Sequence, residues 1–92
     1  MPEQRNPIAV QFGRSLLRVR KQAGHSQEAL AVMASLHRTE IGLLERGERM
    51  PRIDTAIKLA SALGIEADEL VKDIEWMPGS VERGGFTVGD KA

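Results

Sequence analysis

The 92-residue chain contains no cysteine and no tyrosine, and its aromatic residues are one tryptophan and two phenylalanines. Without cysteine the chain can form no disulfide framework, no thiolate zinc site and no cysteine nucleophile. No apolar run approaches the roughly 20 residues that are needed to span a bilayer. The first residues also lack the apolar stretch of a signal peptide. These absences favour a cytoplasmic protein without a membrane partner.

The length and the charge of the chain narrow the expectation further. A chain of 92 residues corresponds to one small domain with room for four or five short helices. The net charge of zero conceals nine basic against five acidic side chains in residues 1–52, and four against eight in residues 53–92. A net charge of +4 in one half is what a polyanion-binding face would give, although chance can produce the same imbalance.

Apolar residues at helical spacing predict five helices, at residues 8–22, 26–34, 38–46, 53–63 and 67–73. Ser26 is a good N-cap for the second helix, and Gly24, Gly47 and Gly64 are stop signals. The inward-facing positions expected in the second, fourth and fifth helices are Ala29, Leu30, Met33, Ile53, Ala56, Ile57, Ala60, Leu63, Leu70, Val71 and Ile74.

The C-terminal residues, 74–92, differ in composition from the rest because they are rich in glycine and contain Pro78. Ile74 and Trp76 would share one face of an extended segment, and Phe86 and Val88 would share another. This pattern predicts an arm or a β-hairpin, and the alternative is a mobile tail. The aromatic residues favour the ordered arm. The chain thus divides into an N-terminal segment (1–8), a helical domain (9–73) and this tail (74–92).

The second and third helices, joined by about three residues, form a helix-turn-helix unit, whose second helix can enter a DNA major groove about 12 Å wide. Several motifs occur in a characteristic order: Val19-Arg20-Lys21, Gly24, Ser26-Gln27-Glu28-Ala29-Leu30-Ala31, Leu36-His37-Arg38-Thr39-Glu40-Ile41, Leu44-Glu45-Arg46-Gly47, Pro51-Arg52 and Leu59-Ala60-Ser61-Ala62-Leu63-Gly64. Over roughly residues 9–73 they resemble the Xre/Cro-type helix-turn-helix transcriptional regulators, which include the phage repressors. The resemblance implies an all-α, five-helix, phage-repressor-like DNA-binding domain.

The resemblance also implies which residues bind double-stranded DNA. Gln27 is expected to hydrogen-bond the DNA backbone at the start of the second helix, where free N–H groups suit a phosphate. Arg38 begins the third helix and can bond guanine in bidentate fashion, unless it is only a solvated surface charge. The arginines in the loop between the third and fourth helices are expected to lie along the DNA backbone. The full DNA-binding set is Ser26, Gln27, His37, Arg38, Thr39, Gly42, Leu43, Arg46, Arg49 and Arg52.

Four positions depart from the family pattern. Leu43 can make only apolar contact, for example with a thymine methyl. Ser35 stands where glycine is common, and a left-handed backbone there would cost roughly 1 kcal/mol. His37 replaces the usual Ser or Thr cap of the third helix, and His25 replaces an apolar residue. Two isolated histidines are expected to be structural, so we expect no metal site and no cofactor.

Two further expectations concern assembly. The resemblance implies a partly buried ion pair between Arg20 and Glu45, whereas the sequence alone fits two unrelated surface charges equally well. We also expect a homodimer, because one helix-turn-helix reads only a few base pairs and a two-fold pair reads two half-sites. The expected dimer interface, unless these residues only cover the core of the monomer, consists of Leu70, Ile74, Trp76, Phe86 and Val88.

The leading hypothesis is a sequence-specific DNA-binding transcriptional regulator, a repressor that reads a palindromic operator as a dimer. A stand-alone repressor, a restriction–modification controller and the antitoxin of a toxin partner fit equally well. The alternative class is a protein-interaction module on the same fold, supported by Leu43 and by the apolar tail residues. No phosphate loop, paired-carboxylate motif or nucleophile motif is present, so we do not expect an enzyme.

Overall fold

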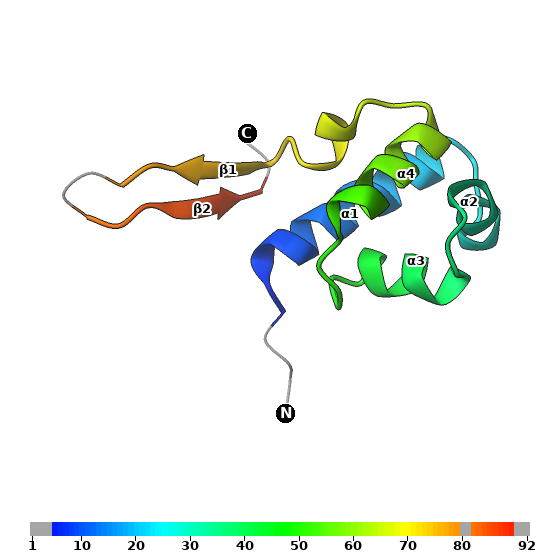
Figure 1. Ribbon diagram of the computed structural model, residues 1–92, viewed down its shortest axis with the longest axis horizontal. Helices are drawn as coiled ribbons and strands as arrows, with labels where there is room; N and C mark the ends of the chain where they lie inside the picture. The colour runs from blue at the N-terminus through cyan, green and yellow to red at the C-terminus, as the bar shows by residue number, and fades with distance from the viewer. Residues whose placement is uncertain (1–4, 80–81, 90–92) are drawn as a thin grey trace.

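The computed structural model describes residues 5–79 and 82–89. Four α-helices come first: α1 (Pro7–Gln22), α2 (Gln27–Ala34), α3 (Arg38–Glu45) and α4 (Ile53–Leu63). A short 3-10 helix, η1 (Ala67–Leu70), leads to the antiparallel strands β1 (Ile74–Met77) and β2 (Gly85–Val88). The helices form one body, and the hairpin projects away from it (Figure 1). Four of the expected helices are therefore confirmed within one or two residues at each end.

The fifth expected helix, at residues 67–73, is wrong. The structure has a single 3-10 helix at Ala67–Leu70 and then enters β1. Asp73 is already part of the hairpin ladder, because its carbonyl accepts a hydrogen bond from the amide of Gly89 at 2.9 Å. Pairing of the strands thus begins where the helix would have continued, and 3-10 segments are short in any case. The described residues hold four α-helices and a hairpin, not five helices.

The core lies where α1, α2, α3, α4 and η1 meet. Seven large side chains are fully buried there: Phe12, Leu16, Leu30, Ile41, Leu44, Leu59 and Leu70. Gly13 allows α1 to approach α3 closely, because a β-carbon at this position would collide with the backbone carbonyl of Leu44. This close crossing brings the first half of α1 against the C-terminal end of α3.

The inner stripe predicted for α4 is wrong in part. Ile53 and Ile57 are 79% and 56% exposed, whereas Thr55, Leu59 and Ala60 are buried. The helix carries apolar residues on two faces, and the packing against α2 and η1 selects one of them. Two further residues that were expected to face inward, Met33 and Val71, are also exposed.

The predicted hairpin is confirmed for the described residues. Trp76 pairs with Phe86 and Ile74 pairs with Val88 across the two strands. The rings of Trp76 and Phe86 lie edge to face, with centroids 5.0 Å apart and an interplanar angle of 67°. Residues 1–4 of the expected N-terminal segment and residues 80–81 and 90–92 of the expected tail lie outside the described part of the chain.

Candidate nucleic-acid interface

The caps of α2 and α3 set the geometry of the helix-turn-helix unit. Ser26 Oγ accepts a hydrogen bond from the amide of Ala29 at 3.0 Å and so caps α2. Ser35 ends α2 in the left-handed region, with φ 57° and ψ 44°, which is the strained conformation considered for this serine. His37 caps α3, because its Nδ1 accepts from the amide of Thr39 at 3.1 Å. The imidazole thus replaces the usual hydroxyl cap.

A hollow of ≈ 200 Å³ lies between the start of α2 and the outer face of α3. All five of its lining residues belong to the DNA-binding set predicted from the sequence: Gln27, Arg38, Thr39, Gly42 and Arg46. Arg38 and Thr39 are exposed in the first turn of α3. Gly42 is buried beneath Arg46, and a β-carbon there would lie 2.9 Å from Arg46 Nη1. Leu43 is half-buried, whereas Ser26 and His37 are exposed beside the hollow.

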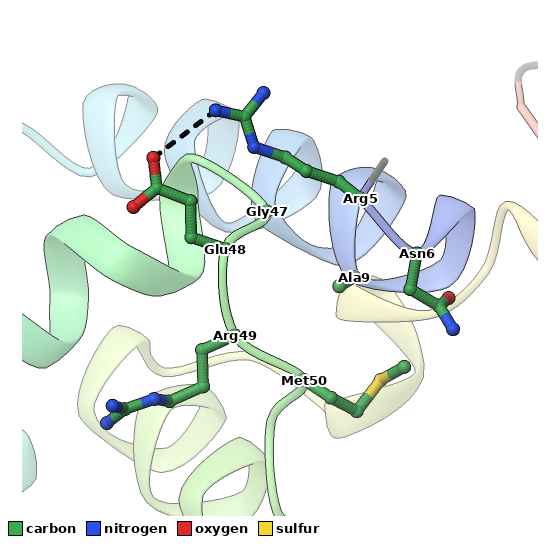
Figure 2. A pocket seen from close by; sticks show the side chains of 7 residues that line it. All are labelled: Arg5, Asn6, Ala9, Gly47, Glu48, Arg49 and Met50. Carbon is green, nitrogen blue, oxygen red and sulfur yellow. Dashed lines mark hydrogen bonds and ion pairs between the residues drawn. The ribbon is translucent and has the colours of Figure 1, made fainter. Parts of the chain in front are cut away.

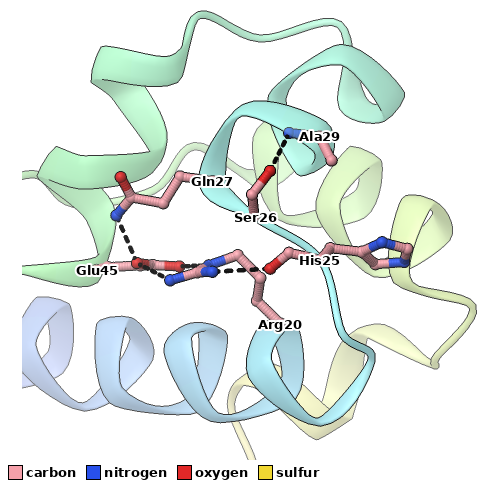
Figure 3. A network of polar contacts seen from close by, with 6 residues as sticks. All are labelled: Arg20, His25, Ser26, Gln27, Ala29 and Glu45. Carbon is pink, nitrogen blue, oxygen red and sulfur yellow. Dashed lines mark hydrogen bonds and ion pairs between the residues drawn. The ribbon is translucent and has the colours of Figure 1, made fainter.

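A buried polar network joins the first three helices beneath this hollow (Figure 3). Arg20 Nε lies 2.6 Å from Glu45 Oε2, and Arg20 Nη2 lies 3.1 Å from Glu45 Oε1. The remaining donors of Arg20 include Nη1, which bonds the carbonyl of His25 at 2.8 Å. The Arg20 and Glu45 side chains are only 10% and 4% exposed. The pair implied by the resemblance thus connects the end of α1 to the end of α3.

Gln27 connects this network to the hollow. Its Nε2 donates to Glu45 Oε1 at 2.8 Å, and the residue is half-buried. The amide nitrogen of glutamine carries two protons. One proton serves Glu45, and the other can serve an acceptor outside the protein, such as a phosphate oxygen.

The three loop arginines predicted to follow the DNA backbone each pair with a carboxylate of the same chain. Arg46 Nε lies 3.1 Å from Glu48 Oε2, Arg49 Nη1 lies 3.8 Å from Glu40 Oε1, and Arg52 Nε lies 3.2 Å from Asp54 Oδ1. Arg38, by contrast, forms no hydrogen bond or ion pair with any residue that the structure describes.

Among these carboxylates, Glu48 is the one that pairs with two arginines, Arg46 and Arg5. The hydrogen bond from Arg46 holds the pKa of Glu48 below its ordinary value, and the charges of Arg46 and Arg5 act in the same direction. Gly47 shapes this corner with a positive φ of 71°, and a β-carbon there would lie 2.8 Å from the Cα of Val10. The loop therefore lies tightly against α1.

The chain matches the helix-turn-helix family over residues 16–70, which is more than half of its length. This chain belongs to the Xre/Cro-type helix-turn-helix family. The match includes the residues that line the hollow and both members of the buried ion pair. It ends at residue 70, so the hairpin lies outside it.

Two relatives and one operator complex illustrate the membership. Control protein C.BamHI of Bacillus amyloliquefaciens is 37% identical over 67 residues, which are 72% of this chain and 83% of that protein. Restriction–modification controller protein C.AhdI from Aeromonas hydrophila superposes with a TM-score of 0.66 and 44% identity, over 67% of this chain and 94% of that one. The P22 c2 repressor in complex with a synthetic operator gives 0.62 and 30%, over 66% and 92%. The helical fold is therefore that of phage-repressor DNA-binding domains.

The residues expected at the dimer interface of this helix-turn-helix protein are not all accessible. Leu70 is fully buried in the core of the protomer, and Ile74 is half-buried. Trp76, Phe86 and Val88 are 54%, 56% and 40% exposed. The exposed members of the set are thus Trp76, Phe86 and Val88, which all lie in the hairpin.

The carboxylates that pair with the loop arginines were not predicted from the sequence. A signal for two of them was present, because Glu48 and Asp54 each follow an arginine by two residues. The pairing of Glu40 with Arg49 joins α3 to the loop and has no comparable sequence signal.

The described residues provide neither a membrane span nor a metal cluster. Within residues 5–79 and 82–89, no helix has the length and apolar character to cross a bilayer. No group of three or more His, Asp or Glu side chains in that part of the chain could hold a metal ion.

Proposed function

We propose that this chain is a sequence-specific, double-stranded DNA-binding transcriptional regulator, a repressor that reads a palindromic operator as a dimer in the cytoplasm. The observation that carries the proposal is the hollow lined by Gln27, Arg38, Thr39, Gly42 and Arg46. It combines the start of α2, which suits a phosphate, with the exposed first turn of α3, which suits base edges. The similarity to an operator-bound repressor supports the use of this face.

Arg38 has the properties of a base-contacting residue. It is exposed, and it has no partner among the described residues. A cation at the N-terminus of a helix is disfavoured by the helix dipole, so its position is not explained by the stability of α3. Arginine is also the side chain that most often bonds guanine O6 and N7. Arg46, Arg49 and Arg52 would bind the DNA backbone on either side of this base contact.

Selection of bound sequences from a random duplex pool tests the proposal most directly. We expect a palindrome whose two half-sites lie about one DNA turn, roughly 34 Å, apart. In a mobility-shift assay the selected duplex should bind about a thousandfold or more tighter than a scrambled one. A chain that enriches no sequence and shifts no duplex at low salt would belong to the alternative class of protein-interaction modules.

The dimer is a separate part of the proposal. We assign its interface to the exposed hairpin residues, because an isolated two-stranded hairpin is marginally stable in water and gains from cover. The test compares Trp76→Ser/Phe86→Ser with Ile53→Ser/Ile57→Ser, which removes exposed apolar side chains from α4, in sedimentation equilibrium. Loss of the dimer only in the hairpin variant supports the assignment. Loss only in the α4 variant moves the interface to α4, and a monomeric parent chain contradicts the dimer.

Among the regulatory roles, the control proteins among the relatives favour a restriction–modification controller. Such a controller should bind the duplex upstream of neighbouring restriction and methyltransferase genes. An antitoxin should instead co-purify with a small partner protein from its natural host. A reporter placed behind the selected operator gives the sign of regulation, and we expect repression.

A further inference from the structure

Glu48 lies between two arginines at the edge of the proposed interface. Its Oε2 is 3.1 Å from Arg46 Nε and 3.3 Å from Arg5 Nη2, and its Oε1 is 3.4 Å from Arg46 Nη2. Figure 2 shows the carboxylate turned toward Arg5, at the corner where the α3–α4 loop passes the start of α1. The carboxylate is charged at neutral pH, as an ordinary glutamate is, and the hydrogen bond from Arg46 lowers its pKa further.

Arg46 contacts both the carboxylate of Glu48 and the hollow. Its Nε and Nη2 hold Glu48, while its Nη1 covers Gly42 at the wall of the hollow. A phosphate that approaches Arg46 therefore meets a guanidinium whose charge is already compensated. It also meets the negatively charged carboxylate of Glu48, which is hydrogen-bonded to the same guanidinium.

We propose that Glu48 is an internal counter-ion of the DNA interface, which Arg46 exchanges for a phosphate on binding. The inference rests on the proposed DNA-binding function and adds a residue that tunes it. DNA affinity comes largely from cations that leave the duplex when protein cations neutralise its phosphates. Arg46 must leave its own carboxylate before it can neutralise a phosphate, and the cost of breaking that ion pair is subtracted from the binding free energy. Glu48 thus makes binding weaker than the number of arginines alone would make it.

Arg5 makes this exchange feasible, and it acts as a positioning residue. Its ion pair with Glu48 does not involve Arg46, so the carboxylate still has a cation beside it after Arg46 has turned to a phosphate. Arg5 and Glu48 are 45% and 28% exposed, which allows both side chains to move without leaving a buried charge unpaired.

The decisive variant is Glu48→Gln, which removes the charge but keeps the shape of the side chain. Its control is Glu66→Gln, which changes the net charge equally. Glu66 is exposed, lies beyond the far end of α4 from Arg52, and has no side-chain partner among the described residues. Binding to a random duplex and to the selected operator is measured by fluorescence anisotropy at several salt concentrations.

We expect Glu48→Gln to bind a random duplex several-fold tighter than the parent chain at low salt. The slope of log affinity against log salt should stay close to that of the parent chain, because Arg46 neutralises one phosphate in both. Glu66→Gln should leave the affinity close to that of the parent chain. Equal affinities for the two variants would overturn the inference.

A double variant shows whether Glu48 acts through Arg46. In an Arg46→Gln background, the further change Glu48→Gln should have no effect on the affinity, because the exchanging cation is absent. A full effect in that background would overturn the exchange and leave Glu48 as a long-range charge. If the parent chain bound neither duplex, the proposed function itself would be contradicted. If it bound DNA and Glu48→Gln changed nothing, only the counter-ion role would fail.

Discussion

Two ion pairs of the same chemistry occupy opposite environments in this protein. Arg20 with Glu45 and Arg46 with Glu48 are both bidentate contacts between a guanidinium and a carboxylate. The side chains of the first pair are 10% and 4% exposed, and those of the second are 56% and 28% exposed. Burial, and not residue type, therefore separates an arginine that holds two helices together from one whose charge stays accessible at the surface.

The groups that surround the two pairs also differ in burial. Around the buried pair, the remaining polar atoms are satisfied by the carbonyl of His25 and the amide of Gln27. Around the exposed pair, the further partner is a second exposed cation, Arg5. Breaking the first pair would leave a nearly buried charge without its counter-ion, whereas breaking the second would expose both charges to solvent.

The largest expected effect comes from breaking the buried pair. Glu45→Ala leaves Arg20 as a buried charge with only the His25 carbonyl, so we expect a loss of about 3 kcal/mol or more in unfolding free energy. For a domain of this size that lowers Tm by more than about 10 °C. Glu48→Ala, the matched exposed variant, should change Tm little. Thermal unfolding followed by circular dichroism measures both, and equal shifts would contradict the contrast.

The next effect separates arginines that contact bases from those that contact phosphates. Arg38→Ala should weaken operator binding by ~1–3 kcal/mol and relax the preferred base at one position in each half-site. Arg52→Ala should weaken operator and random DNA alike, and should flatten the salt slope by about 0.9 for each phosphate that is no longer neutralised. The measurements are selection from the random pool and salt-dependent anisotropy.

If Arg38→Ala reduced affinity equally for all sequences, Arg38 would be another phosphate-binding residue. Specificity would then come from Thr39, Leu43 or the shape of the DNA.

A smaller effect is expected at Gln27, which lies between the two environments. Gln27→Ala removes a hydrogen bond to the buried carboxylate of Glu45, which corresponds to about 1 kcal/mol and a Tm shift of roughly 4–8 °C. Gln22→Ala, at the exposed end of α1, is the control and should shift Tm much less. A Gln27→Ala chain as stable as its control would show that Glu45 does not need the amide.

The smallest effect is a titration. Because Arg46 lowers the pKa of Glu48 in the folded state, the carboxyl should titrate below its ordinary value in an NMR pH series. Its contribution to stability is present above the unfolded-state pKa and is lost as the pH falls through the folded-state pKa. Arg46→Ala should raise the midpoint. An unchanged midpoint would mean that Arg5 alone holds the carboxylate.

The elements bounded by strong local signals were predictable from the sequence. Ser26 marks the start of α2 and Gly64 ends α4 with a φ of 70°, and both boundaries agree with the structure. Local sequence signals failed where contacts between distant segments determine the secondary structure. The segment after Leu70 was expected to be helical, but the pairing of Ile74 with Val88 takes it into a strand.

The candidate site was predicted from the resemblance more than from physical pattern. The motif order placed Gln27, Arg38 and Arg46 on one face, and the structure gathers them around one hollow. The partners of the arginines depend on side-chain geometry in the loop, which periodicity does not describe. The same limit explains Leu70, whose apolar side chain was assigned to an interface but is buried in the core.

The cross-strand contact of Trp76 with Phe86 has a spectroscopic consequence. Trp76 is the single tryptophan of the chain, and tyrosine is absent. Intrinsic fluorescence therefore comes from the hairpin, while far-ultraviolet circular dichroism comes mainly from the helices. One sample thus carries two separate optical reporters. Coincident melting curves would show that the arm and the helical body unfold as one cooperative unit, and a blue shift of the emission on concentration would show the indole leaving water as chains associate.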